Sequence, residues 1–446
     1  MLNLFERFDT PSRDLLRSQH IANIKIPTVV MEDDGFLPDE LDSPFKYFSK
    51  LRKNHQPLYF DQIPVPKYWR ILGNGNRAEI FDLDCKRAEV IYMATDNTRI
   101  VKEVQWLNNA NDISWIDHYN KNGFKFAQTL YSKGQPVTKK YFNGQGATVI
   151  TWNLVAGDLF LDDKHIHHHF ADFIDFMIFY LHERHYKLDR IFYNTLNKAL
   201  NLSLRLSEPG EDTLFWYEKI DQELPGNMTF LMQHKTRTKH IVFQRFDDWQ
   251  RHNQLIPADT GEVDFQYLGM IYPHPRSNHL RPNALVITNS DQIEQLGELA
   301  NLMPNVHINI AAITEMSDKL SAFQDYPNID LYPTVSGTRL QELLKISDVY
   351  LDINQGNEIL DAVRGAFEQN MLILSFSDVL HNGIFTANSN VFVNGDARGM
   401  AKQILTALVQ PQLMKKLIDT QRLEASDVTV GDYQRTFRKL MGENNE

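Results

Sequence analysis

Residues 122–153, NGFKFAQTLYSKGQPVTKKYFNGQGATVITWN, decide how this chain folds. Short runs of alternating apolar and polar residues are separated here by Asn-Gly, Lys-Gly and Gln-Gly pairs. Glycine adopts positive φ without steric cost, so such pairs between extended runs indicate hairpin turns. Period-two alternation places apolar side chains on one face of a strand and polar ones on the other. The stretch therefore predicts an antiparallel meander.

The same pattern extends outward from Trp69 to Leu161, where we expect five to seven consecutive hairpin strands and no crossover helix. A meander has two faces and open edges, so one face or edge must meet another part of a protein. Strand and helix patterns precede and follow it. These observations predict an all-β module inserted into an α/β protein.

The flanking segments carry their own boundary signals. Asp9-Thr10-Pro11-Ser12 indicates a helix start with Thr10 as the N-cap. Residues 26–31 form an apolar run typical of a buried strand, and residues 167–186 have apolar residues at helical spacing. From Ala284 to Val393, apolar strands alternate with helical segments, which is the pattern of a doubly wound parallel sheet.

Together these signals predict a GT-B-like architecture, in which two Rossmann-like domains face each other across a cleft. We expect the first domain to be split into residues 1–68 and 162–256, with the extended β-sheet domain 69–161 inserted in it. Residues 257–446 form the second domain and end in helices. Fold alone does not establish an activity.

Composition excludes several classes of protein. The 446 residues include 46 Lys and Arg against 57 Asp and Glu, a net charge of −11, which disfavours nucleic-acid binding and a polybasic membrane anchor. The single cysteine, Cys85, allows neither an intrachain disulfide nor a thiolate zinc site, so a reducing cytoplasm is the expected setting. The first residues carry charges and no apolar h-region, unlike a signal peptide.

Five stretches carry a resemblance to a known family. They are FLPDE at 36–40, FDQIPVP at 60–66, ELPGNM at 223–228, ITNSDQIE at 287–294 and YLDIN at 350–354. In these the chain resembles the stabilising subunit of the accessory Sec glycosyltransferase pair. The resemblance covers nearly the whole chain. It implies a GT-B-like fold with an inserted β-sheet domain, and a catalytic N-acetylglucosaminyltransferase partner that modifies serine-rich repeat adhesins before export.

Related retaining GT-B enzymes carry two glutamates spaced E-x7-E, and this chain departs from that pattern. The flanking strands place the two positions at Asn357 and Gly365, whereas Glu358 and Glu368 stand ten residues apart. Such enzymes also hold the donor diphosphate with an Arg and a Lys, where this chain has Asn289 and Asp291. A carboxylate at that place repels a diphosphate. The N-terminal glycine-rich turn is missing too, so we predict a pseudo-enzyme with no catalytic residues and no cofactor.

Polar residues at predicted strand ends are the candidates for an acceptor-binding cleft, because ligands of open α/β sheets lie outside the strand carboxyl ends. Loops 272–276, 355–358 and 375–378 should converge there. The candidates are Tyr272, His274, Arg276, Gln355, Asn357, Glu358, Ser375, Ser377 and Asp378. Ordinary loop capping is the alternative, and a proline-stiffened interdomain loop is the alternative for 272–276.

Two further features bear on partners and metals. The meander should bind the catalytic subunit through its apolar face, with Phe124, Phe126, Tyr141 and Ile150 as candidate contacts. The run KHIHHH at 164–169 has histidines four apart, but its acidic neighbours suit a helix start, so we predict no metal.

These inferences combine into a non-catalytic subunit that stabilises its partner and binds the serine-rich acceptor. The expected assembly is a hetero-oligomer without nucleic acid, with a heterotetramer as the candidate stoichiometry. It should be cytoplasmic and meet the membrane only peripherally, through partners. Two alternatives stay open: an active glycosyltransferase with a divergent UDP-sugar site, and a purely structural subunit.

Overall fold

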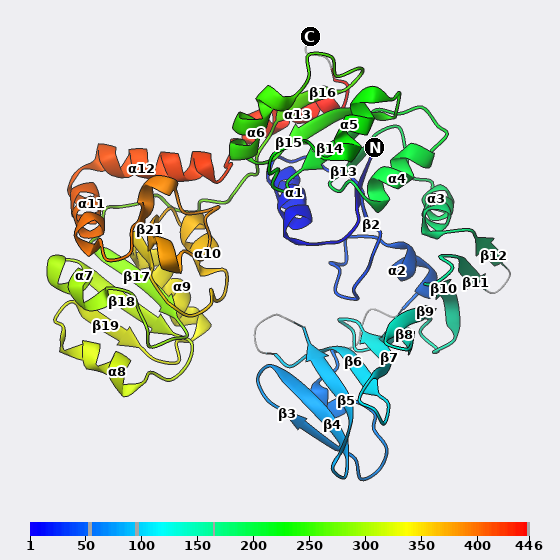
Figure 1. Cartoon of the computed structure of the whole chain (residues 1–446), viewed down its shortest axis with the longest axis horizontal. Coiled ribbons are helices and arrows are strands. Elements are labelled where there is room, and N and C mark those ends of the chain that lie inside the picture. The colour runs from blue at the N-terminus through cyan, green and yellow to red at the C-terminus, as the bar shows by residue number, and fades with distance from the viewer. Residues whose placement is uncertain (52–55, 94–97, 164–165, 444–446) are drawn as a thin grey trace.

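A computed structural model describes residues 1–51, 56–93, 98–163 and 166–443. It contains three β-sheets, two parallel sheets of six strands and one antiparallel sheet of ten strands (Figure 1). The first parallel sheet and its helices lie at the upper right of the figure, the antiparallel sheet runs below them, and the second parallel sheet lies at the left. The predicted α/β class with an antiparallel insertion is confirmed.

The first domain is built on a parallel sheet with strand order β16-β15-β14-β13-β1-β2. Leu2–Phe5, a strand that the sequence pattern did not reveal, is β1, which lies next to the edge strand β2 and pairs with both β2 and β13. The other strands are β2 (Thr28–Val30), β13 (Ile191–Tyr193), β14 (Asp212–Trp216), β15 (Thr238–Phe243) and β16 (Asp264–Tyr267). The helices are α1 (Thr10–Ile21), α2 (Pro44–Ser49), α3 (Phe173–Glu183), α4 (Lys198–Arg205), α5 (Gly226–Gln233) and α6 (Phe246–His252).

Helix starts in this domain follow from capping chemistry. The side chain of Asp9 accepts a hydrogen bond from the Ser12 backbone N–H at 3.1 Å, so Asp9 is the N-cap of α1 and the expected cap at Thr10 is wrong by one residue. Asp172 caps α3 in the same way, through the N–H groups of Ile174 and Asp175. The helix predicted at 167–186 is present as α3, but it begins at Phe173 and not at residue 167, because the residues before this cap are extended.

The inserted sheet has ten strands in sequential antiparallel order, more than the five to seven predicted. The strands are β3 (Arg70–Gly73), β4 (Arg77–Asp82), β5 (Cys85–Tyr92), β6 (Val101–Leu107), β7 (Ile113–Tyr119), β8 (Lys125–Ser132), β9 (Gln135–Phe142), β10 (Thr148–Asn153), β11 (Leu159–Asp163) and β12 (Ile166–Phe170). The sheet thus runs past Leu161 to Phe170, and β12 pairs with β11 where a helix was expected.

The two halves of this sheet are covered on opposite faces. Through successive cross-strand pairs, Val90 shares a face with Val104, Asp117, Gln128 and Lys140. Near β4 to β6 that face is buried with residues of the segment 58–69, whereas the opposite face carries charged side chains. Near β8 to β12 the opposite face, which includes Tyr141, Ile150 and Leu161, is buried against α2 and α3.

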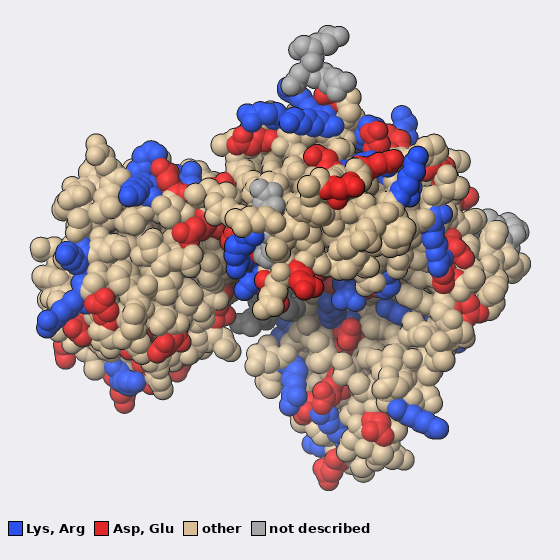
Figure 2. All heavy atoms as spheres, turned by 45° about the horizontal axis from the view of Figure 1, so that its top comes forward, with Lys and Arg blue, Asp and Glu red and all other residues tan. Residues whose placement is uncertain are grey.

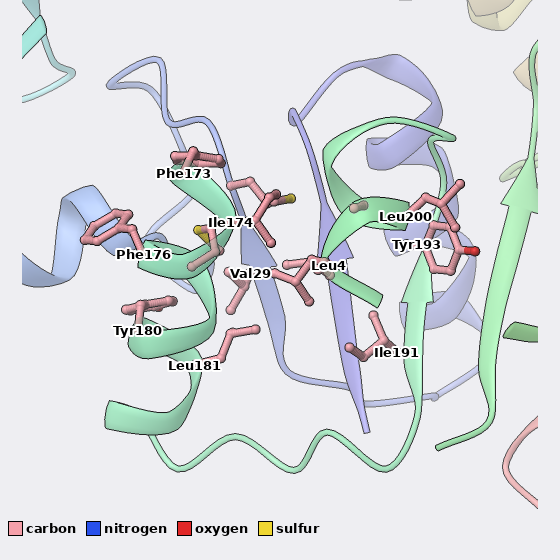
Figure 3. Close-up of a cluster of buried hydrophobic side chains, with 14 of the residues drawn as sticks. Leu4, Val29, Phe173, Ile174, Phe176, Tyr180, Leu181, Ile191, Tyr193 and Leu200 are labelled. Carbon is pink, nitrogen blue, oxygen red and sulfur yellow. The ribbon is translucent and has the colours of Figure 1, made fainter. Parts of the chain in front are cut away.

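Aromatic side chains hold this second contact together. The rings of Phe45 on α2 and Tyr141 on β9 stack at 3.9 Å, and those of Trp152 and Phe173 stack at 4.9 Å. Figure 3 shows Phe173, Ile174 and Leu181 of α3 lying beside Leu4 and Val29 of the parallel sheet, so one core joins sheet, helix and meander. The meander is anchored to the first domain by its apolar residues.

The second domain is a parallel sheet with strand order β19-β18-β17-β20-β21-β22. Its strands are β17 (Asn283–Thr288), β18 (His307–Ala312), β19 (Ile329–Tyr332), β20 (Val349–Asp352), β21 (Leu372–Phe376) and β22 (Val391–Phe392). Its helices are α7 (Leu296–Leu302), α8 (Asp318–Ser321), α9 (Gly337–Ile346), α10 (Ala362–Glu368), α11 (Ala397–Val409) and α12 (Pro411–Glu424). Every strand predicted between Ala284 and Val393 is present, with each end within one residue of its predicted place.

The last helix, α13 (Val430–Leu440), returns to the first domain (Figure 1). Its Phe437 stacks on Phe215 of β14 at 5.5 Å, and Tyr433 lies fully buried. A buried ion pair also joins the domains, since Arg364 of α10 contacts both carboxylate oxygens of Asp14 of α1 at 2.6 and 2.9 Å. None of the described helices combines the length and hydropathy that a membrane span requires.

Candidate functional site

The carboxyl edge of the second sheet is occupied by loops that bond to one another. The Glu294 N–H donates to the carbonyl of Ile353 at 2.7 Å, and the Gln355 N–H donates to that of Gln292 at 2.9 Å. Gly356 packs so closely on this loop that a Cβ there would lie 2.2 Å from the Oδ1 atom of Asn289. The segments 289–294 and 354–357 therefore form one joined surface above the strand ends.

A histidine locks this surface to the end of β20. The Nδ1 atom of His381 lies 2.5 Å from Asp352 Oδ1, and its Nε2 atom lies 2.6 Å from the carbonyl oxygen of Gly356. Burial lowers the pKa of His381, but the bonds to Gly356 and Asp352 outweigh burial and raise it above its ordinary value. The basic side chain at this edge, His381, is thus already bound to Asp352 and Gly356.

The two positions of the glutamate pattern have no carboxylate, and the neighbouring acid has another role. Gly365 lies within α10 with no atom within 4 Å of a built Cβ. Asn357 is exposed. Glu358 accepts a hydrogen bond from the Val363 N–H at 3.1 Å, which satisfies a backbone donor in the first turn of α10. Asp291 accepts from the Ser317 hydroxyl at 3.1 Å.

The predicted convergence of the three loops fails for residues 272–276. The Nη1 atom of Arg276 lies 2.6 Å from Asp348, which precedes β20, so this arginine lies at the amino edge of the sheet, opposite Gln355. Tyr272 is 4% exposed, with Phe367 and Phe385 against its ring, and His274 bonds to Asp427 at 2.8 Å. These three side chains are structural, as the interdomain-loop alternative expected.

The other two loops do meet at the carboxyl edge, because β20 and β21 are adjacent parallel strands. Ser375 is fully buried and donates to the carbonyl of Asp352 at 2.7 Å. Gln355, Ser377 and Asp378 are exposed there together with Asn357, and these polar side chains remain candidates for ligand contact.

The proposed partner contacts on the meander need correction. Phe126, Tyr141 and Ile150 are 5%, 2% and 0% exposed and belong to the core shared with α2 and α3, so they cannot meet another protein in this fold. Phe124 is half-buried. Apolar residues on the open face of the same strands are accessible instead: Trp115 and Leu130 are half-buried, and Phe160 is 47% exposed.

A cavity that the sequence did not predict lies where the meander meets the first domain. It encloses about 730 Å³ between the start of α1, the loop after β2 and strands β6, β7 and β9, and we call it the junction cavity. Figure 2 shows a deep recess between the lobes of the molecule, with basic and acidic side chains mixed on the surface around it. The sequence does contain one indication of this cavity. Lys139, a charged residue, stands two positions before Tyr141 on the apolar face of β9.

The described part of the histidine run, residues 166–169, lies in strand β12. His167 and His169 lie on β12 and contact Asp162 and Asp158 at 2.9 and 3.1 Å, while His165 is outside the described residues. Across the ranges that the structure describes, no three His, Cys, Asp or Glu side chains are grouped to hold a metal ion.

Four family models match consecutive parts of the chain. They are the GtfB N-terminal domain at residues 2–48, the GtfB middle domain at 69–171, the GtfB third domain at 173–255 and the GftB/GlyA-F C-terminal domain at 284–421. The middle-domain match covers the ten strands of the antiparallel sheet.

Relatives match along nearly their full length. The UDP-N-acetylglucosamine–peptide N-acetylglucosaminyltransferase stabilizing protein GtfB of Limosilactobacillus reuteri subsp. suis is 55% identical, over 99% of this chain and 100% of the relative. The protein of the same name from Streptococcus gordonii is 36% identical, over 99% of both chains.

Solved structures agree with these matches. A chain of the crystal structure of the GtfA/B complex bound to UDP and GlcNAc has 36% identity and a TM-score of 0.93, over 99% of this chain and 100% of that one. Accessory secretory protein 1, 2 and 3 of Streptococcus pneumoniae gives a TM-score of 0.65 at 12% identity, which is a likeness of fold alone. The chain belongs to the GtfB family of N-acetylglucosaminyltransferase-stabilizing proteins.

Proposed function

We propose that this protein is a non-catalytic subunit that stabilises a peptide N-acetylglucosaminyltransferase and binds its acceptor. The full-length match to stabilizing proteins of that name carries the proposal. The partner is a catalytic subunit of the kind called GtfA in the matching complex, in a hetero-oligomer that we take to be a heterotetramer. The acceptor is a serine-rich repeat adhesin, modified in the cytoplasm at the membrane periphery before export.

The residues at the carboxyl ends of the second-domain strands support a subunit without catalytic activity. Asn357 and Gly365 stand where two carboxylates would be required, and Asn289 and Asp291 stand where two cations would hold a diphosphate. The bonds of His381 to Asp352 and Gly356 further occupy the edge with the protein's own groups. The phosphates of a UDP-sugar would therefore meet the carboxylate of Asp291 in place of a neutralising cation.

Calorimetric titration of the full chain tests the proposal. We expect no saturable heat with UDP-N-acetylglucosamine and a saturable heat with an unmodified serine- and threonine-rich peptide. The catalytic partner, titrated with the same nucleotide sugar, serves as the positive control. Saturable UDP-sugar binding that Asn289→Ala or Asn357→Ala abolishes would instead establish an active glycosyltransferase with a divergent site. Absence of any peptide binding, alone or in the complex, would leave a purely structural subunit.

A further inference from the structure

We propose that the junction cavity holds the acceptor chain, with the ammonium group of Lys139 as its polar anchor; this rests on the acceptor-binding function proposed above. The volume of about 730 Å³ falls within the range of pockets that enclose a ligand. Its floor is the face of the meander that carries Lys139 and Tyr141, and its rim is formed by the loop after β2 and the start of α1.

Most charged groups that line the cavity already have partners. Lys102 lies 3.0 Å from Asp34, and Glu103 lies 3.3 Å from His118 on the neighbouring strand. Glu32 accepts from Arg7 at 2.8 Å and also pairs with Lys198. Asp33 accepts from the Gly35 N–H at 2.7 Å and from the Ser43 hydroxyl at 3.0 Å.

Lys139 is the exception. Within the described parts of the chain its ammonium group has no ion pair or hydrogen bond; it lies 5.2 Å from the Tyr141 ring, and the carboxylates of Glu32, Glu103 and Asp33 act on it only at longer range. Burial among the strands lowers the pKa of Lys139. An ammonium group has three N–H donors, and one that is half-buried without hydrogen-bond acceptors is a site for a ligand that supplies them.

The charge of the walls selects an uncharged ligand. Five acidic and four basic side chains line the cavity, so an anion would face carboxylates and a cation would face Lys139. Carbonyl and hydroxyl oxygens satisfy an ammonium group without bringing charge. The half-buried rings of Phe8 and Phe36 and the thioether of Met93 add apolar surface for methyl groups. An extended chain of serine, threonine and alanine has these properties.

Peptide binding to two lysine variants tests the location. Lys139 and Lys140 are neighbours on β9 whose side chains project to opposite faces, so Lys140→Met is a matched control for Lys139→Met. With a fluorescein-labelled peptide of serine, threonine and alanine, we expect Lys139→Met to raise the Kd about tenfold, the effect of losing a hydrogen bond to a charged donor. Lys140→Met should bind as the parent does. A peptide in which one central serine is replaced by glutamate should bind the parent more weakly.

A measurement on the unaltered protein avoids any dependence on the folding of a variant. Reductive methylation of the full chain, followed by mass spectrometry, should modify Lys139 less when the peptide is present and Lys140 equally in both samples. Two results would overturn this location: equal methylation of Lys139 with and without saturating peptide, or a Kd of Lys139→Met equal to that of the parent. In either case the protein would still bind the acceptor, but at another site. Failure of the parent to bind the peptide would overturn the acceptor function itself.

Discussion

At the scale of single residues, the protonation of His381 links stability to pH. Its two ring nitrogens face Asp352 and the carbonyl of Gly356, both acceptors when the carboxylate is ionised, so the imidazole that satisfies both carries two protons. Burial raises the pKa of Asp352 and opposes this arrangement. We assign the proton to the imidazole, because Asp352 also accepts the His381 backbone N–H at 2.9 Å.

The pKa of His381 is raised on folding, so its stabilisation is complete below the unfolded pKa of about 6.5 and is lost as pH rises through the folded value. We expect His381→Gln to lower the free energy of unfolding by about 1.5–3 kcal/mol at about pH 6, and by clearly less at about pH 9. Urea unfolding of parent and variant at both pH values measures this. An equal cost at the two values would show that the histidine stays neutral.

At the scale of elements, two glycines on either side of the start of α10 differ in the space that surrounds them. Gly365 lies inside the helix, and a Cβ there meets no atom within 4 Å, whereas a Cβ at Gly356 would lie 2.2 Å from Asn289. Gly365→Ala should raise the free energy of unfolding by about 0.5–1 kcal/mol, because glycine loses more backbone entropy in a helix than alanine does. Thermal unfolding should show a higher Tm.

Gly356→Ala serves as the contrasting variant. It should lower the Tm, because the joined loops must separate to admit the methyl group. A Tm for Gly365→Ala at or below the parental value would mean that α10 frays at this position, and an unchanged Tm for Gly356→Ala would mean that the two loops are not held together.

At the scale of the whole molecule, the open face of the meander is the surface that we expect the catalytic subunit to cover. The face that packs on α2 and α3 is already buried, whereas Phe160 of β11 and Leu130 of β8 lie on the other face and are accessible. Leu130→Glu combined with Phe160→Glu should abolish co-purification with the catalytic subunit, because a desolvated carboxylate opposes association.

Val409→Glu is the matched control for that pair. Val409 ends α11 in the second domain and is 75% exposed, so the charge should leave both the fold and the complex intact. Circular dichroism and urea unfolding of each variant verify folding. If the folded double variant still co-purifies at the parental ratio, the partner binds the sheet edges or another domain.

Much of the architecture followed from local patterns. Glycine-containing turn pairs and period-two alternation predicted the antiparallel meander, and alternating apolar strands and helices predicted the second parallel sheet, because both signals depend on backbone preferences of neighbouring residues. Leu2–Phe5 was missed, because a strand of four residues that includes the polar Asn3 is too short to show a pattern and lacks flanking turn signals. The boundaries proposed for the domains stay a prediction.

By itself, the sequence determined the fold class, and it predicted the loss of a carboxylate at Gly365 and of a cation at Asp291, since these depend on residue identity and spacing alone. Only the tertiary structure decided which apolar face is covered: an alternating strand looks the same whether a helix of its own chain or a partner protein covers it. It also decided that Arg276 binds Asp348 at the amino edge of the sheet, and that Lys139 faces a cavity. These placements depend on long-range pairing, which local sequence does not encode.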